Sequence, residues 1–148
     1  MPFTESATQP AQLDQQALID ALVRTSFVTM AVLTKIGAEH DLSLTQLRML
    51  AILRDRRAKM SALADYLGLD KSTISGLVDR AEKRGLLQRE ANPVDGRSVE
   101  VVLTREGTEL AARGATEIAG SLSPMTNTLN RAEMHRLTTL LERMLEHH

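Results

Sequence analysis

Apolar residues follow helical spacing over most of this chain and alternate with polar ones in one short region. In the clearest case Ile74, Leu77, Val78 and Ala81 stand at offsets 0, 3, 4 and 7, which places them on one face of a helix. Similar spacing predicts helices over residues 11–38, from Ser43 to the charged run at 54–57, 61–67, 71–84, 104–122, and from Asn130 onward. The chain is therefore expected to be mainly α-helical.

Alternation begins after Gly85, a residue type that commonly stops helices. One face of a predicted strand carries Val99, Val101 and Leu103, and the other carries Ser98 and Glu100. Residues 87–91 form its partner strand, and Asp95-Gly96 is the turn signal between them. Upstream, Gly68 turns the chain between two short helices, and Asp70 is placed to cap the second. The pattern predicts a helix-turn-helix followed by a two-stranded wing.

The helices on either side of this unit also carry end signals. Ser43 and Gln46 form a capping box, and Thr104 caps the helix that Pro124 is expected to end. A second capping box precedes the last helix, at Asn130 and Glu133. The inner stripe of the helix after Ser43 is expected to be Leu44, Leu47, Leu50 and Ala51.

Both ends of the chain are more apolar than a single small domain requires. The helix over residues 11–38 would be roughly 40 Å long and has apolar residues on more than one face. The last helix carries an apolar stripe of Met134, Leu137, Leu141 and Met144. We therefore expect residues 1–42 and 105–148 to form a helical dimerisation region, and residues 43–104 to form a DNA-binding domain.

The polar face of the 71–84 helix has the composition of a DNA-reading surface. Its start combines a cation with small hydroxyl residues, namely Lys71, Ser72, Thr73 and Ser75. The hydroxyls are also ordinary helix-start residues, which bond first-turn amides. Gly76 costs helix stability, and it would let a thymine methyl group or the DNA backbone come close. Arg80 and Lys83 lie downstream on the same face, where phosphate contacts are expected.

The predicted hairpin tip adds an arginine. Arg97 is expected to enter a minor groove, whose narrow and negative channel attracts a guanidinium group. Asp95, two residues earlier, is placed to hold the Arg97 side chain. The alternative for Arg97 is an ordinary solvated hairpin tip.

Several of these segments resemble the MarR family of bacterial transcription regulators. The resemblance rests on Leu63-Ala64-Asp65-Tyr66-Leu67-Gly68, the Lys71–Ser75 helix start, Glu82-Lys83-Arg84-Gly85-Leu86, Asp95-Gly96-Arg97-Ser98 and Leu103-Thr104-Arg105-Glu106-Gly107. It implies a homodimeric winged-helix repressor that binds a palindromic operator. It also implies release by a small aromatic or phenolic ligand, for which we name Val28, Val32, Met49 and Arg89 as lining residues. No cofactor is expected.

Composition narrows the remaining choices. The net charge is −1, but residues 54–105 hold 11 Lys or Arg against 8 Asp or Glu, so the positive excess lies on the predicted DNA-binding unit. No uninterrupted run of about 18 apolar residues and no basic leader before an apolar run are found, so a soluble cytoplasmic protein without a membrane role is expected. His147 and His148 resemble the start of an expression tag.

Other functions have weaker support in the sequence. There is no cysteine, and His40 and His135 lack metal-site or catalytic-triad spacing, so neither an enzyme nor a metal site is expected. A metal-responsive regulator, with Glu39 and His40 in its site, remains one alternative. The other is a winged-helix module for protein contacts, which would not need a basic face on the second helix of the motif.

Overall fold

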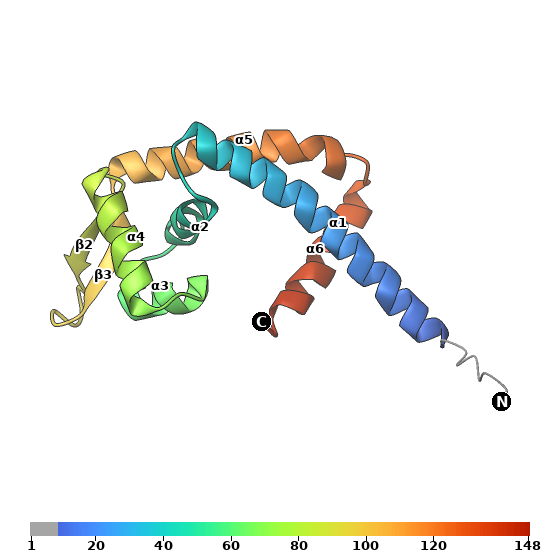
Figure 1. Ribbon diagram of the computed structural model, residues 1–148, viewed down its shortest axis with the longest axis horizontal. Helices are drawn as coiled ribbons and strands as arrows, with labels where there is room; N and C mark the ends of the chain where they lie inside the picture. The colour runs from blue at the N-terminus through green and yellow to red at the C-terminus, as the bar shows by residue number, and fades with distance from the viewer. Residues whose placement is uncertain (1–8) are drawn as a thin grey trace, which may run out of the picture.

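The computed structural model describes residues 9–148, which form six helices and a small sheet (Figure 1). The helices are α1 (Pro10–Glu39), α2 (Leu44–Leu53), α3 (Met60–Leu67), α4 (Lys71–Lys83), α5 (Arg105–Thr126) and α6 (Arg131–Leu145). The strands are β1 (Ala58–Lys59), β2 (Leu87–Ala91) and β3 (Val99–Leu103). The predicted fold class, mainly α with a hairpin wing, is confirmed. The first eight residues of the predicted dimerisation region lie outside the described part of the chain.

The hydrophobic core lies inside the winged helix-turn-helix. Helices α2, α3 and α4 and the sheet surround it, and α5 contributes Leu110. Met49, Leu63, Val78 and Val101 have no exposed surface. Apart from Ile36 and Leu110, the buried apolar side chains come from residues 42–102. This one core holds the elements that carry the predicted DNA-binding residues.

The two ends of the chain contribute little to that core. Helices α1 and α5 pack together above α2, and the N-terminal half of α1 extends away from the winged helix-turn-helix (Figure 1). Only Ile36 and Gly37 of α1 are buried, and no residue of α6 is. The exposed apolar side chains of these two helices are Leu13, Leu18, Ile19, Val23, Phe27, Val28, Met30, Met134, Leu137, Leu141, Met144 and Leu145.

Within the described residues, α1 is also the one helix long and apolar enough to cross a membrane, by length and composition alone. None of its most apolar window is buried within the chain. Asp20 and Arg24 interrupt the apolar sequence near the middle of the helix. Charged groups at that depth of a bilayer are costly, whereas a second protein surface can leave them at its edge.

The sheet contains one strand that the sequence pattern missed. Its order is β1-β3-β2, with Ala58 opposite Val101 and Leu87 opposite Leu103. β1 covers the second edge of β3. Glu100, which the alternation placed on the face opposite Val101, is only 8% exposed.

The inner stripe of α2 also differs from the prediction. Leu47 and Leu50 are buried as expected, but the other two buried residues are Met49 and Leu53. Leu44 and Ala51 are exposed, and they border a cavity between α1, α2 and α5. α2 therefore packs over a wider arc than one stripe, because the winged-helix core lies on one side of it and α1 and α5 on another.

Pro124 does not end α5, which continues to Thr126. A proline removes the hydrogen bond to the carbonyl four residues earlier, here that of Gly120. The hydroxyl of Ser123 donates to that carbonyl instead, at 3.2 Å. With the lost bond replaced locally, the helix completes its last turn.

The start of α5 is packed against the segment between α4 and β2. The hydroxyl of Thr104 accepts a hydrogen bond from the Gly107 N–H at 3.0 Å and donates one to the Gly85 carbonyl at 2.5 Å. A Cβ built on Gly107 would lie only 2.0 Å from the Leu86 carbonyl oxygen. The Leu-Thr-x-x-Gly sequence is thus a packing requirement, since only glycine allows this close approach.

We predict that Gly107→Ala lowers the free energy of unfolding by about 1 to 3 kcal/mol, because the helix and the backbone at Leu86 must move apart. Denaturant unfolding followed by circular dichroism measures this. Gly76→Ala is the control: its Cβ would meet only the flexible end of Arg80, at 3.5 Å, so up to about 1 kcal/mol of added stability is expected. Equal effects of the two substitutions would contradict this account.

Candidate nucleic-acid interface

Helix α4 begins at Lys71, as the sequence pattern predicted, because Gly68 and Asp70 define the turn before it. Gly68 adopts the left-handed conformation (φ 66°) that ends α3. The Asp70 carboxylate then accepts a hydrogen bond from the Thr73 N–H at 2.8 Å and another from the Ser72 hydroxyl at 2.9 Å. The bond from the Thr73 N–H is the main reason that the pKa of Asp70 lies below its ordinary value.

The two faces of α4 separate as predicted. Ile74, Leu77, Val78 and Ala81 are buried in the core. Lys71, Ser72, Thr73, Arg80 and Lys83 are exposed, and Ser75 and Gly76 are half-buried. The core therefore fixes the rotation of the helix, and the predicted DNA-binding residues of α4 face outward together. Because the Ser72 hydroxyl donates to Asp70, its lone pairs remain the part available to a ligand.

Arg89 of β2 neutralises the two acidic residues on the flank of α4. Its guanidinium donates to Asp79 at 2.7 Å and to Glu82 at 2.6 Å. The hydrogen bond to Asp79 is the main cause that raises the pKa of Arg89. Among the described residues, no ion pair involves Lys71, Arg80, Lys83 or Arg97. Among the described residues, the cations of α4 are thus left without an ion pair, whereas both acidic side chains of α4 have one.

A second arginine fixes the far end of α4. Arg84 donates to the backbone carbonyls of His40 and Asp41, at 2.9 and 2.7 Å. Asp41 has a left-handed backbone (φ 55°) in the corner between α1 and α2. The end of α4 is thereby tied directly to the end of the long helix α1. The sequence pattern did not reveal this contact, because the residues involved are more than 40 positions apart.

The wing presents Arg97 to solvent, as expected of a groove-reading residue. Asp95 makes a different contact from the one predicted: its carboxylate accepts the backbone N–H of Arg97 at 3.2 Å. Asp95 thus shapes the turn, and the guanidinium group stays free among the described residues.

A shallow cleft of about 480 Å³ opens between the start of α4, the start of α3 and β3. Lys59, Ser61, Lys71 and Ser75 line it, together with Met60, Ile74 and Val99. Lys59 and Ser61 were not predicted as site residues. Their lysine and hydroxyl groups would extend the basic surface of α4 toward the DNA backbone.

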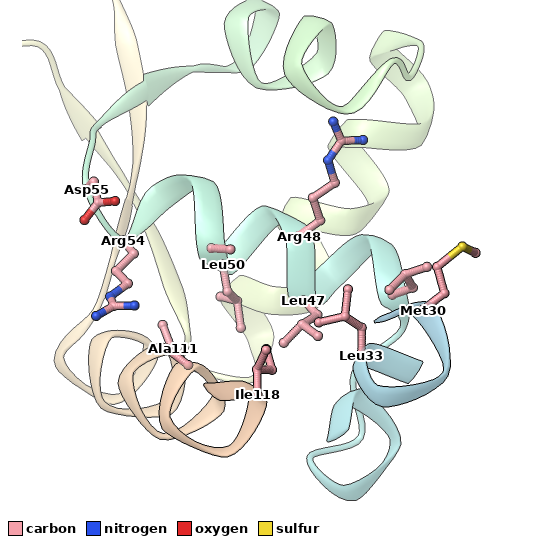
Figure 2. A pocket seen from close by; sticks show the side chains of 12 residues that line it. Met30, Leu33, Leu47, Arg48, Leu50, Arg54, Asp55, Ala111 and Ile118 are labelled. Carbon is pink, nitrogen blue, oxygen red and sulfur yellow. The ribbon is translucent and has the colours of Figure 1, made fainter. Parts of the chain in front are cut away.

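An apolar cavity of about 410 Å³ lies between α1, α2 and α5 (Figure 2). Leu33, Leu47 and Ile118 point into it, and Arg48 and Arg54 border it (Figure 2). The four residues named from the sequence as ligand-lining are not brought together. Val28 is exposed on α1, Val32 borders a separate cleft, Met49 is fully buried, and Arg89 is paired with α4.

His40 pairs with Glu117 of α5, with 2.9 Å between its Nε2 atom and the carboxylate. Within residues 9–148 no three His, Cys, Asp or Glu side chains gather as metal ligands would. The pair instead joins the corner after α1 to the middle of α5.

Comparisons with known proteins agree with this geometry. The MarR family profile matches residues 40–98. The chain is 30% identical to the HTH-type transcriptional regulator PecS of Dickeya dadantii, over 91% of this chain and 84% of that protein. It is 27% identical to the homoprotocatechuate degradative operon repressor of Escherichia coli, over 87% and 88% of the two chains. The crystal structure of NadR in complex with 4-hydroxyphenylacetate has the same fold, with a TM-score of 0.73, 23% identity and 97% coverage of both chains.

The helix-turn-helix has a basic outward face and the wing has an exposed arginine. These two features agree with the relatives, which are transcriptional regulators. The chain belongs to the MarR family of transcriptional regulators.

Proposed function

We propose that this protein is a cytoplasmic, homodimeric repressor that binds a palindromic DNA operator and releases it on binding a small aromatic or phenolic acid. One observation carries the proposal: the core holds α4 so that Lys71, Arg80 and Lys83 face solvent without an ion pair to any residue of the described part of the chain, on the same unit as exposed Arg97. Acidic neighbours on α4 are already paired with Arg89. Such a surface suits a phosphate backbone better than a protein partner.

The order of residues along α4 fits entry into a major groove. Small side chains, Ser72, Ser75 and Gly76, occupy the first half of the outward face and permit close approach to base edges. Arg80 and Lys83 follow one to two turns later, where long side chains reach phosphates. Two such helices about 34 to 36 Å apart, one turn of DNA, would read the two halves of a palindrome.

Arg97→Ala is expected to weaken binding to DNA from upstream of the gene by about 1 to 3 kcal/mol, because a minor-groove guanidinium is lost. Fluorescence anisotropy over a salt series measures the affinity and its salt slope. Arg131→Ala removes the same charge from α6 and should leave the affinity nearly unchanged. If both variants bind as the parent protein does, Arg97 does not contact the DNA.

The proposed dimer accounts for the exposed helices at both chain ends. α6 has 15 residues, none of them buried, and an isolated helix of that length is marginal in water. Its apolar stripe of Met134, Leu137, Leu141 and Met144 is 38–45% exposed. A second copy brings an identical stripe and the exposed apolar side chains of α1. A membrane would have to accept Asp20 and Arg24 as well.

Leu137→Glu is expected to shift the protein toward monomer, because it places a charge in the centre of the stripe. Sedimentation equilibrium measures the dimer dissociation constant. The same variant should bind a two-half-site operator roughly tenfold or more weakly, since the second contact is no longer linked to the first. Thr139→Glu adds the same charge to the opposite face of α6 and should change neither. A wild-type protein that remains monomeric would disprove the dimer.

The cavity of Figure 2 is the proposed ligand site. Its volume of about 410 Å³ and apolar walls suit a small aromatic ring. The guanidinium group of Arg54, at the border of the cavity, has no hydrogen bond or ion pair among the described residues, which leaves it available to a carboxylate. NadR, whose fold this chain shares, was crystallised with 4-hydroxyphenylacetate. A ligand between α1, α2 and α5 would change how the dimer helices sit on the winged helix-turn-helix, and so the spacing of the two α4 helices.

With 4-hydroxyphenylacetate and related phenolic acids as probes, we predict that at least one of them releases the protein from DNA. Ala111→Leu fills the cavity and should weaken that response roughly tenfold or more, while DNA binding without ligand is kept. Ala112→Leu is the control on the same helix, outside the cavity. A full response in Ala111→Leu would place the ligand elsewhere.

A further inference from the structure

A buried carboxylate connects the wing to the body of the domain. Glu100 of β3 is 8% exposed, and its Oε2 atom accepts a hydrogen bond from Arg57 Nε at 2.7 Å. Arg57 lies in the loop after α2 and also pairs with Glu90 of β2, at 2.9 Å. The hydrogen bond to Glu100 is the main cause that raises the pKa of Arg57. One oxygen of Glu100 is thus occupied by the domain body.

The other oxygen of Glu100 is occupied by the wing. The side-chain N–H of Asn92 donates to Glu100 Oε1. The amide oxygen of Asn92 accepts the backbone N–H groups of Val94 and Asp95, at 2.8 and 3.0 Å. The backbone of Asn92 also donates to the Ser98 carbonyl, at 2.8 Å. One side chain therefore holds the wing turn from within and fixes it to a buried anchor below.

We infer that Asn92 and Glu100 are positioning residues, which set the conformation of the wing turn and thereby aim Arg97 at the DNA. The inference rests on the proposed DNA-binding function. Arg97 is two residues beyond Asp95, whose N–H is bonded to Asn92 and whose carboxylate is bonded to the backbone of Arg97. The path from Arg57 to the backbone of Arg97 is therefore continuous in hydrogen bonds.

The donors and acceptors along this path match at each position. Glu100 offers two acceptors and faces two donors, from Arg57 and Asn92. Asn92 offers one donor toward Glu100 and one acceptor toward the turn, which an amide supplies and a carboxylate does not. Glutamine at position 100 would turn an N–H group toward one of the two donors. Aspartate at position 92 would place two carboxylates in contact.

Because of this matching, the effect of each substitution on the hydrogen bonds can be distinguished from its effect on the net charge. Glu100→Gln removes a negative charge near the DNA, so electrostatics alone predicts tighter binding. Loss of the wing anchor predicts the opposite. The double variant Asn92→Asp/Glu100→Gln keeps the parent net charge and restores every pairing: glutamine donates to Asp at position 92 and accepts from Arg57.

The experiment compares operator affinity for the parent, the two single variants and the double variant by fluorescence anisotropy. We expect each single variant to bind roughly three- to tenfold more weakly, and the double variant to return to within about twofold of the parent. In an Arg97→Ala background the single substitutions should cost little more, because they act through that residue. Val94→Asp, at a side chain 97% exposed, measures the effect of an added charge in the same loop.

Amide exchange rates of Val94 and Asp95, measured by NMR without DNA, test the anchor independently. Both rates should rise in the single variants and fall again in the double variant. Tight DNA binding by Glu100→Gln, or a double variant as weak as the weaker single one, would overturn the inference. If the parent protein binds no DNA, the proposed function is wrong. Independently of DNA binding, unchanged amide exchange in the single variants would show that Asn92 and Glu100 do not hold the wing turn.

Discussion

The rotation of α4 about its axis is the constraint on which the rest of the molecule depends. Burial of Ile74, Leu77, Val78 and Ala81 fixes that rotation, because each is at most 7% exposed in the core. Burying a side chain of the size of Ile74, Leu77 or Val78 contributes about 1.5 to 3 kcal/mol. A turn of the helix by one residue, about 100°, would expose part of this set and bury part of the basic face. The outward surface is therefore a consequence of what lies underneath it.

Polar contacts then fix the two ends and the flank of α4, which the core does not hold. Asp70 defines where α4 begins, Arg84 ties its end to the corner after α1, and Arg89 holds its flank to β2. The same corner meets α5 through His40 and Glu117. The end of α1, a helix expected to bind a second subunit, is thus in direct contact with the end of the helix expected to bind DNA. A change in the angle between α1 and α5 has a short path to α4, through a handful of bonds rather than through the whole core.

Capping and spacing signals within a few residues predicted the helices and the hairpin well. Contacts between residues far apart in the sequence could not be predicted. Capping residues such as Ser43, Asp70 and Asn130 act within three residues, so their bonds are readable from the chain. The burial of Glu100 depends on Arg57, 43 positions earlier, and on a two-residue strand too short to have a pattern. Pro124 was misleading because Ser123 replaces the lost hydrogen bond. Helical spacing placed the polar side chains of α4 on one exposed face, and the turn signal placed Arg97 at the hairpin tip, whereas the cavity forms only when α1, α2 and α5 pack together.

The exposure of α6 has a consequence for how fast the protein is degraded in a cell. In a single chain, an N-terminal capping box and the hydrogen bonds of the helix itself stabilise α6, none of whose residues is buried. Segments that open easily are where proteases cut first. In the proposed dimer α6 is covered, so unassembled chains would be degraded faster than dimers, and the amount of protein in the cell would be limited by the rate at which dimers form.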